Sequence, residues 1–503
     1  MNSSIKVMLW DEEIGRLSWD NRRKTSYFTY NPEYVSKGLE LAPLTAPIKG
    51  GNTLMPVWGE SGKIYQKLPA FLADSLPDSW GNQLFDLWAK EQHLAKPDIT
   101  PLEKLSFIGR RGMGALEFIP EVKLGKSKDK VDVQSLIELA QRIFKDRENA
   151  VIRPDESITM QALIAVGTSA GGRQPKAILA VNRETGEITS GQIAGQENSD
   201  YCILKFGDAS RSSAELEMAY YKMAIAAGIT MMHSELKEVG ECRHFLTMRY
   251  DRDGSRKLHT QTLAAISPDD DSYESLLTTC RKLHLPESDC QEIFRRMVFN
   301  HLANNTDDHN KNFSFIMTPD GQWRLSPAYD MTFIFDLGGY LPNREHCIFA
   351  RGKLSGLTLQ DALDFAKENG IRRPESIIRK VAESVARFRE FATECGAADE
   401  WIGRVETCLD SNLKAWGFKQ EEEWSAFVID GYSVSNPRLT QAYKGNLHLT
   451  ATVDGKDRKY IIRQGTDEYE RITKAGISNI KNEYLIELVV RYIIQTIFQR
   501  PCF

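Results

Sequence analysis

Short alternating segments and one amphipathic stretch organise the first part of the chain. The stretches "IKVMLW" (5–10) and "TSYFTY" (25–30) combine alternating apolar positions with aromatic residues, which is typical of strands. Between 79 and 92, apolar side chains recur at helical spacing, at Trp80, Leu84, Leu87 and Trp88. The pattern therefore predicts a mixed α/β subdomain over residues 1–122.

The pattern changes after a polar, lysine-rich stretch at 123–132, which is predicted to be a linker. A helix is predicted directly after it, at 133–144. From about residue 160 to 252 the pattern favours strands and turns around one helix, with strands at 178–182, 201–206 and 244–252 and the helix at 213–228. Residues 123–252 are thus predicted to form one lobe, and the mostly helical stretch 253–417 a second.

The last segment, 418–503, has a different character. Strand-like runs surround "VDGK" (453–456), an Asp-Gly hairpin signal, and an apolar helix is predicted at 484–498. That helix carries Glu487 and Arg491 and is too short to cross a bilayer, so no membrane span is predicted. We expect a small α+β appendage of open role, with packing or dimerisation favoured over a ligand site.

Composition narrows the function classes. The 503 residues carry 64 basic and 69 acidic side chains, a net charge of −5 that argues against coating nucleic acid by bulk charge. None of the eight cysteines forms a CxxC pair, and no signal peptide is recognisable at the N-terminus. We therefore expect a cytoplasmic protein with reduced thiols.

The stretch "NNTDDHNKNFSF" (304–315) concentrates polar chemistry before an apolar strand. Asp307 and Asn312 stand five residues apart, and Asp330 in "LSPAYD" follows eighteen residues later. Transfer of a phosphoryl group from ATP needs a carboxylate that accepts a hydroxyl proton, and an amide and a second carboxylate that hold Mg²⁺. Kinase catalytic loops use this order. Taken alone, the same residue types also serve helix caps and turns.

A second signal lies upstream, in "VGTSAGGRQPKAILAV" (166–181). Its small residues, flanked by predicted apolar strands, would let backbone N–H groups approach phosphates. In "YCILKF", Lys205 sits in an otherwise apolar strand, and a helix with Glu217 follows. A lone strand lysine is usually an edge residue. In this order it also fits the lysine that contacts ATP phosphates, and pairing with Glu217 stays open.

Together these motifs, with "LPAFLADSLPDSWG" and "GRRGMGALEF" near the N-terminus, resemble the HipA family of toxin kinases over roughly residues 5–417. The resemblance implies an α+β, protein-kinase-like bilobal fold with an N-terminal mixed α/β subdomain. It implies that Asp307 is the catalytic base, that Asn312 and Asp330 hold Mg²⁺, and that Ser169 is autophosphorylated. It further implies an ATP site formed by Lys205, Gly171, Gly172, Met248, Tyr250, His309 and Tyr329.

The resemblance also implies a function and partners. It predicts an ATP- and Mg²⁺-dependent serine/threonine-protein kinase, the toxin of a toxin–antitoxin pair, with an aminoacyl-tRNA synthetase as a substrate class. A small HipB-like helix-turn-helix antitoxin would bind the toxin and the operator DNA, and a homodimer stays open.

Two features depart from the family pattern, and two other functions remain. The C-terminal tail is longer than in the family, and Thr168 beside Ser169 offers a second phosphoacceptor. The match is also looser at Met248, which stands where a family member has an acidic residue. The same loop chemistry would also serve a small-molecule kinase. A degenerate kinase fold that serves as a corepressor is disfavoured, because the predicted catalytic set is complete: Lys205, Asp307, Asn312 and Asp330 are all present.

Overall fold

The structure is a computed structural model, and its chain divides into two compact units, residues 1–419 and 420–503. It describes residues 3–48, 53–54, 56, 65–94, 99–122, 132–146, 157–167, 174–192, 197–336, 339–419, 427–429, 432–441, 447–453, 456–462 and 469–472. Within them, no helix is both long and apolar enough to cross a membrane. The seven described cysteines are free, and five of them are buried.

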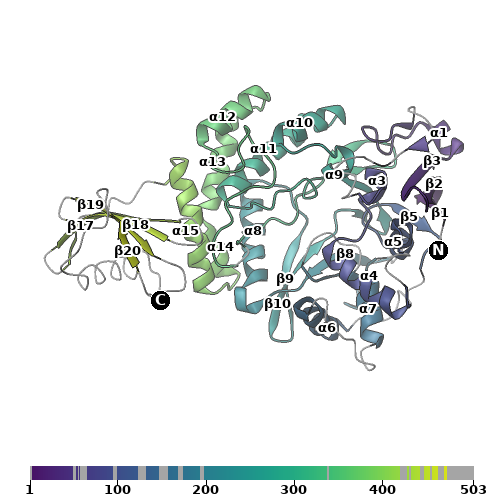
Figure 1. The fold of residues 1–503 in the computed structure, drawn as a ribbon, viewed down its shortest axis with the longest axis horizontal. Helices are drawn as coiled ribbons and strands as arrows, with labels where there is room; N and C mark the ends of the chain where they lie inside the picture. The colour runs from purple at the N-terminus through teal and green to yellow at the C-terminus, as the bar shows by residue number, and fades with distance from the viewer. Residues whose placement is uncertain are drawn as a thin grey trace. The chain divides into compact units, whose positions relative to one another are not determined.

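The N-terminal subdomain is built on a five-stranded antiparallel sheet (Figure 1). Its strand order is β4-β3-β2-β1-β5, with bounds β1 Ser4–Leu9, β2 Glu12–Asp20, β3 Thr25–Tyr30, β4 Thr53–Leu54 and β5 Leu116–Ile119. Apolar side chains at alternate positions of β1 are buried, at Ile5, Val7 and Leu9, as alternation in the sequence predicts. The helices of this region are α1 (Pro32–Lys37), α3 (Ala70–Ala73), α4 (Ser79–Glu91) and α5 (Pro101–Ile108).

A second five-stranded sheet has the order β7-β6-β8-β10-β9. Its bounds are β6 Lys176–Asn182, β7 Ile188–Ser190, β8 Ser199–Lys205, β9 Ser234–Val239 and β10 Cys242–Met248. The helices beside it are α6 (Val133–Asp146), α7 (Ser157–Gly167) and α8 (Ser213–Ala227), with a short 3₁₀ turn, η5, at Ala209–Arg211. A hydrophobic cluster that includes Trp80, Leu163 and Leu204 packs α4 and α7 against this sheet.

One expectation here is wrong. The Gly-rich loop was predicted to lie between two strands, but the segment before it is the helix α7. The run "MQALIAV" is apolar apart from the exposed Gln161, and Met160, Leu163 and Ile164 are buried together. So short and mostly apolar a run carries no clear period that separates a buried helix from a buried strand, so the sequence left this flank undetermined.

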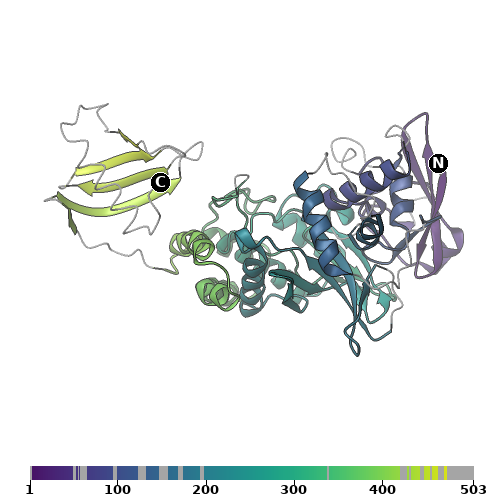
Figure 2. The ribbon, with the colours of Figure 1, turned by 90° about the horizontal axis from the view of Figure 1, so that it is seen from below.

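The second lobe of this unit is mostly helical, as the pattern predicts. Its helices are α9 (Leu263–Ile266), α10 (Tyr273–Lys282), α11 (Glu287–Leu302), α12 (Leu359–Glu368), α13 (Pro374–Val385), α14 (Phe388–Glu394) and α15 (Asp399–Ala415). Its strands are β11 (Arg252–Asp253), β12 (Arg256–Lys257), β13 (His259–Thr262), β14 (Ser314–Met317) and β15 (Trp323–Leu325), the last three forming a small sheet. Figure 2 shows the helices that end the unit, in green, at the opposite end from the N-terminal strands, in purple.

The second unit contains an antiparallel sheet in the order β16-β17-β18-β19-β20. The strands are β16 Phe427–Ile429, β17 Tyr432–Gln441, β18 Leu447–Val453, β19 Lys456–Ile462 and β20 Tyr469–Ile472. Val453 pairs with Lys456, so the Asp-Gly signal does mark a two-residue hairpin connection. The predicted helix at 484–498 and the predicted linker at 123–131 lie outside the described residues. The domain boundaries within 1–419 stay predictions.

Candidate active site

The loop between α11 and β14 holds the two adjacent aspartates in different environments. The side chain of Asp308 is fully buried. Its carboxylate accepts hydrogen bonds from the hydroxyl of Tyr273 at 2.7 Å, Nδ1 of His346 at 2.8 Å and the backbone N–H of Cys347 at 2.8 Å. Charge-assisted bonds of this kind are stronger than neutral ones. Asp308 therefore anchors the loop, and its carboxylate is closed to solvent.

Asp307 is the exposed member of the pair, with 50% of its side chain accessible. The amide nitrogen of Asn312 donates to the backbone carbonyl of Asp307 at 2.6 Å, which closes the loop around the two predicted site residues. Nε2 of His309 lies 3.8 Å from the Asp307 carboxylate. Partial burial raises the pKa of Asp307; His309 opposes this shift and Asp330 adds to it.

A buried lysine joins the two lobes at this place. Nζ of Lys205, at the end of β8, contacts the carboxylates of both Glu217 on α8 and Asp330 beyond β15. Burial alone would lower the pKa of Lys205, but the two carboxylates raise it above its ordinary value, so the ammonium ion is retained. Burial raises the pKa of Glu217, whereas Lys205 and Lys176 hold that of Asp330 below its usual range. The sequence left the Lys205–Glu217 contact open, and the structure contains it.

Tyr329 and Tyr250 form an aromatic wall beside Asp330. Their rings stack with centroids 5.3 Å apart and planes inclined by 15°. The hydroxyl of Tyr329 donates to the carbonyl of Lys311 at 2.7 Å, which ties the wall to the Asp307 loop. Met248 ends β10 two residues before Tyr250, and its backbone N–H donates to the carbonyl of His233 at 2.9 Å. Met248 and Tyr250 are both partly exposed.

Two charged groups at this site were not singled out from the sequence. Lys176 opens β6 and is 3% exposed, and Asp330 and Asp78 are among the charges that act on it. Asp78 caps α4 by accepting from the N–H of Gly81 at 3.0 Å, and burial raises its pKa. The signals were present: Asp78 precedes "SWG" as a helix cap would, and Lys176 follows the Gly-rich stretch. Neither signal indicates that Asp78 and Lys176 lie in the same region of the folded protein.

The Gly-rich loop itself is not part of this geometry. Ser169, Gly171, Gly172 and the neighbouring Thr168 lie outside the described residues. The loop's flanks are described: α7 ends at Gly167 and β6 begins at Lys176. The structure thus brings together Asp307, Asn312, His309, Lys205, Asp330 and Tyr329, with Tyr250 and Met248 at the edge.

Comparison with known proteins agrees with this arrangement. A family model for the HipA N-terminal domain matches residues 5–119, and a model for the HipA-like C-terminal domain matches residues 168–392. A solved complex of Shewanella oneidensis HipA, HipB and its operator DNA aligns with a TM-score of 0.59 and 20% identity, covering 82% of this chain and 98% of that chain. The fold is therefore α+β and kinase-like, with an added N-terminal subdomain, as predicted.

Sequence relatives give the same result. The chain is 22% identical over 358 residues to the serine/threonine-protein kinase toxin HipA of Shewanella oneidensis, which covers 66% of this chain and 75% of that protein. It is 27% identical over 201 residues to a putative kinase of Haemophilus influenzae, covering 36% and 56% respectively. With both domain models matched in order along one chain, the protein belongs to the HipA family.

Proposed function

We propose that this protein is an ATP- and Mg²⁺-dependent serine/threonine-protein kinase that acts as the toxin of a HipA–HipB-like module. The observation that carries the proposal is the contact of Lys205 with both Glu217 and Asp330, next to the Asp307–Asn312 loop. Protein kinases use a strand lysine paired with a helix glutamate, a metal-binding aspartate and a catalytic loop of this spacing.

The proposed reaction follows from these positions. A substrate hydroxyl gives its proton to Asp307 while its oxygen attacks the γ-phosphorus of ATP; the bond from that phosphorus to the β–γ bridging oxygen breaks, and ADP leaves. Lys205 would orient the phosphates, and the Tyr250–Tyr329 wall, with Met248 and His309, would bind the nucleoside.

The residues fit a magnesium ion. No group of three or more His, Cys, Asp or Glu side chains converges anywhere in the described part of the chain. Mg²⁺ often takes only one or two protein ligands together with phosphate oxygens and water. Asp330 would supply a carboxylate oxygen and Asn312 its amide oxygen, since the Asn312 nitrogen already bonds to Asp307. The ion would neutralise charge on the transferred phosphate.

Partners are proposed from the relatives. The Shewanella oneidensis structure holds HipA with HipB and operator DNA, so we propose a HipB-like helix-turn-helix antitoxin for this chain, with DNA reached mainly through it. The net charge of −5 is consistent with that indirect contact. The proposed substrate is a translation component such as an aminoacyl-tRNA synthetase, in the cytoplasm. Residues 418–503 would serve packing or assembly, including a homodimer.

We also propose that autophosphorylation of Ser169 switches the enzyme off. A phosphate adds about −1.5 to −2 charges at neutral pH, and the loop with Gly171 and Gly172 is proposed to hold the negative phosphates of ATP. Like charges do not share such a site, so the modified protein should bind ATP poorly. Phosphopeptide mapping after incubation with Mg-ATP tests which residue is modified, and phosphate on Thr168 alone would assign the modification to Thr168 instead of Ser169. Unchanged ATP affinity of the fully modified protein would refute the proposal that autophosphorylation switches the enzyme off.

The experiment that tests the proposed function compares phosphorylated proteins after induction of the wild type and of Asp307→Ala. We expect growth arrest and new phosphoserine or phosphothreonine only with the wild type, and relief of arrest by Asp330→Asn. Arrest by both inactive variants would favour the corepressor function, in which toxicity comes from binding. ATP-dependent phosphorylation of a sugar or aminoglycoside without any protein substrate would favour a small-molecule kinase.

A further inference from the structure

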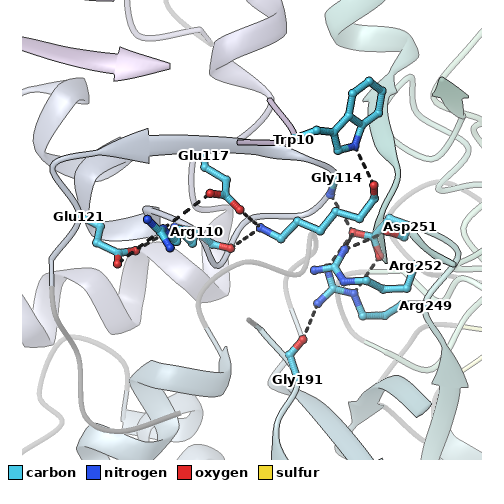
Figure 3. Close-up of polar contacts among 10 residues, drawn as sticks. Trp10, Arg110, Gly114, Glu117, Glu121, Gly191, Arg249, Asp251 and Arg252 are labelled. Atoms are coloured by element: carbon cyan, nitrogen blue, oxygen red, sulfur yellow. Dashed lines mark hydrogen bonds and ion pairs between the residues drawn. The ribbon is translucent and has the colours of Figure 1, made fainter. Parts of the chain in front are cut away.

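Arg249, Asp251 and Arg252 form a buried ion cluster (Figure 3), and two of its members flank Tyr250 of the proposed nucleotide wall in the sequence. Oδ1 of Asp251 accepts from Nε of Arg249 at 2.8 Å, and Oδ2 accepts from Nη2 of Arg249 at 2.7 Å and Nη1 of Arg252 at 2.6 Å. The side chains of Arg249 and Asp251 are 0% exposed. Arg249 and Arg252 hold the pKa of Asp251 far below its ordinary value despite burial, so it stays ionised.

The cluster joins three segments that are distant in sequence. The backbone N–H of Gly114, in the N-terminal subdomain, donates to Oδ2 of Asp251 at 2.7 Å. Nη1 of Arg249 donates to the carbonyl of Gly191, after β7, at 3.1 Å. Figure 3 shows Gly114 and Gly191 meeting the cluster from separate parts of the ribbon. Asp251 is thus the shared acceptor between the N-terminal subdomain and the chain that leaves β10.

A second contact holds the same two parts together. Nζ of Lys257 donates to Glu117 Oε1 at 2.9 Å and to the carbonyl of Arg110 at 2.5 Å, while Nε1 of Trp10 donates to the carbonyl of Lys257 at 2.8 Å. The backbone at Lys257 adjoins the cluster, because Lys257 pairs with Arg252 and the N–H of Leu258 donates to the carbonyl of Asp251 at 3.0 Å. The bonds of the Lys257 side chain, however, go to Glu117 and Arg110. This side-chain contact therefore serves as an internal comparison at the same interface.

Alternation along the chain links the cluster to the site. Arg249 and Asp251 are buried, whereas Met248 and Tyr250 are partly exposed, and Tyr250 stacks on Tyr329. β10 ends at Met248, and Tyr250 and Asp251 lie in the turn that follows it. The buried charges and the proposed nucleotide contacts are therefore neighbouring residues of one four-residue segment, so that holding Arg249 and Asp251 in place also restricts the backbone of Met248 and Tyr250.

Stability alone does not account for such a cluster. Removing charges from water costs about as much as their attraction returns, so a buried ion pair is often no more stable than apolar packing. An arginine fork on a carboxylate instead supplies direction, because two parallel bonds fix the relative orientation of both groups. The geometry is thus better suited to holding a segment in place than to adding stability.

We propose that Asp251 and Arg249 are positioning residues for nucleotide binding, and that through Gly114 they make the N-terminal subdomain a structural part of the nucleotide site. This inference rests on the proposed kinase function. Asp251 has no contact with the nucleotide in this role; it acts by holding the backbone of Met248 and Tyr250.

The test measures nucleotide affinity and stability in full-length variants. Asp251→Asn conserves shape, but Arg249, Arg252 and the Gly114 N–H offer only donors, so the new NH₂ group must oppose at least one of them. We expect affinity for a Mg-bound, non-hydrolysable ATP analogue to fall about tenfold, or ~1.4 kcal/mol. KM for ATP should rise in parallel, while kcat at saturating ATP changes less than about twofold.

Glu117→Gln is the matched control, because it weakens the Lys257 contact at the same interface. We expect it to lower the melting temperature but to leave nucleotide affinity within about twofold of the wild type. If it weakens nucleotide binding as much as Asp251→Asn at equal loss of stability, the cluster is merely structural and the proposal is overturned.

A double-mutant cycle with Tyr250→Ala tests the route of the effect. If Asp251 acts through the Met248–Tyr250 segment, its substitution should cost little further affinity once the Tyr250 ring is gone. Should Asp251→Asn fail to fold, Arg249→Lys enters the same cycle, since it keeps the charge and loses the fork. If nucleotide affinity is unchanged in the Asp251 and Arg249 variants, the positioning role is overturned and the proposed kinase function is not affected. If the wild type itself binds no nucleotide, both the positioning role and the proposed kinase function are overturned.

Discussion

Replacing each of the two adjacent aspartates by alanine should have opposite consequences. Asp308→Ala removes the common acceptor of Tyr273, His346 and the Cys347 N–H, all held within 2.8 Å in a buried site. Each donor left unpaired costs about 1–3 kcal/mol, and partial rearrangement makes the sum less than additive. We expect the free energy of unfolding of residues 1–419 to fall by at least about 3 kcal/mol.

Asp307→Ala should leave stability almost unchanged, because half of that side chain is exposed and its nearest described polar neighbours, Nε2 of His309 and Sγ of Cys347, lie 3.8 Å away. Its free energy of unfolding should stay within about 0.5 kcal/mol of the wild type, while phosphate transfer is lost. Urea unfolding followed by tryptophan fluorescence measures the first quantity, and radiolabelled phosphate transfer the second. Equal unfolding midpoints for the two variants would refute the division of roles between these residues.

Three further outcomes are expected. Lys205→Met should abolish ATP use and leave Glu217 buried beside Asp330 without its lysine partner. Burial already raises the pKa of Glu217, and a buried carboxyl group is tolerated better when it is protonated. The substitution should therefore lower the melting temperature less at pH 5 than at pH 8. Gly114→Ala should cost about 1–3 kcal/mol, because Gly114 has a φ of +74° and a Cβ there would lie 3.1 Å from the backbone nitrogen of Thr260; a melting temperature equal to the wild type would contradict this. A chain ending at Lys419 should fold and bind nucleotide like the full chain, and loss of binding in a folded truncation would show that residues 420–503 complete the site.

Local patterns in the sequence predict the elements that carry the site. Alternation and aromatic content indicate β3 at Thr25–Tyr30, an apolar run indicates β8, which ends on Lys205, and a stretch of helix-forming residues indicates α8 with Glu217. These elements follow from local pattern and composition, which a sequence displays directly. The catalytic-loop spacing adds the order of Asp307, Asn312 and Asp330, which is also local information.

Tertiary pairing accounts for most of what could not be predicted. Lys205 and Asp330 are 125 positions apart, and Gly114 and Asp251 are 137 apart, so no local period relates them. The dipeptide Asp307–Asp308 also gives no indication of which carboxylate is buried. Asp308 is the buried one because Tyr273 and His346, which are distant in the sequence, donate hydrogen bonds to it. Arg249 and Asp251 run against the usual exposure of charged residues, because each finds its partner only in the folded unit.

The attachment of the N-terminal subdomain has a consequence for synthesis on the ribosome. Trp10 bonds to a carbonyl 247 positions later, the Leu41 carbonyl to a side chain 220 positions later, and Tyr65 to a carbonyl 199 positions later. At about 5–20 residues per second, the interval from Gly114 to its partner alone lasts roughly 7–30 s. During that time the strands of the first sheet can pair, but the surface that meets the later lobe stays uncovered. We therefore expect the nascent chain to need chaperone protection, and nucleotide binding to appear only after translation has passed Asp330.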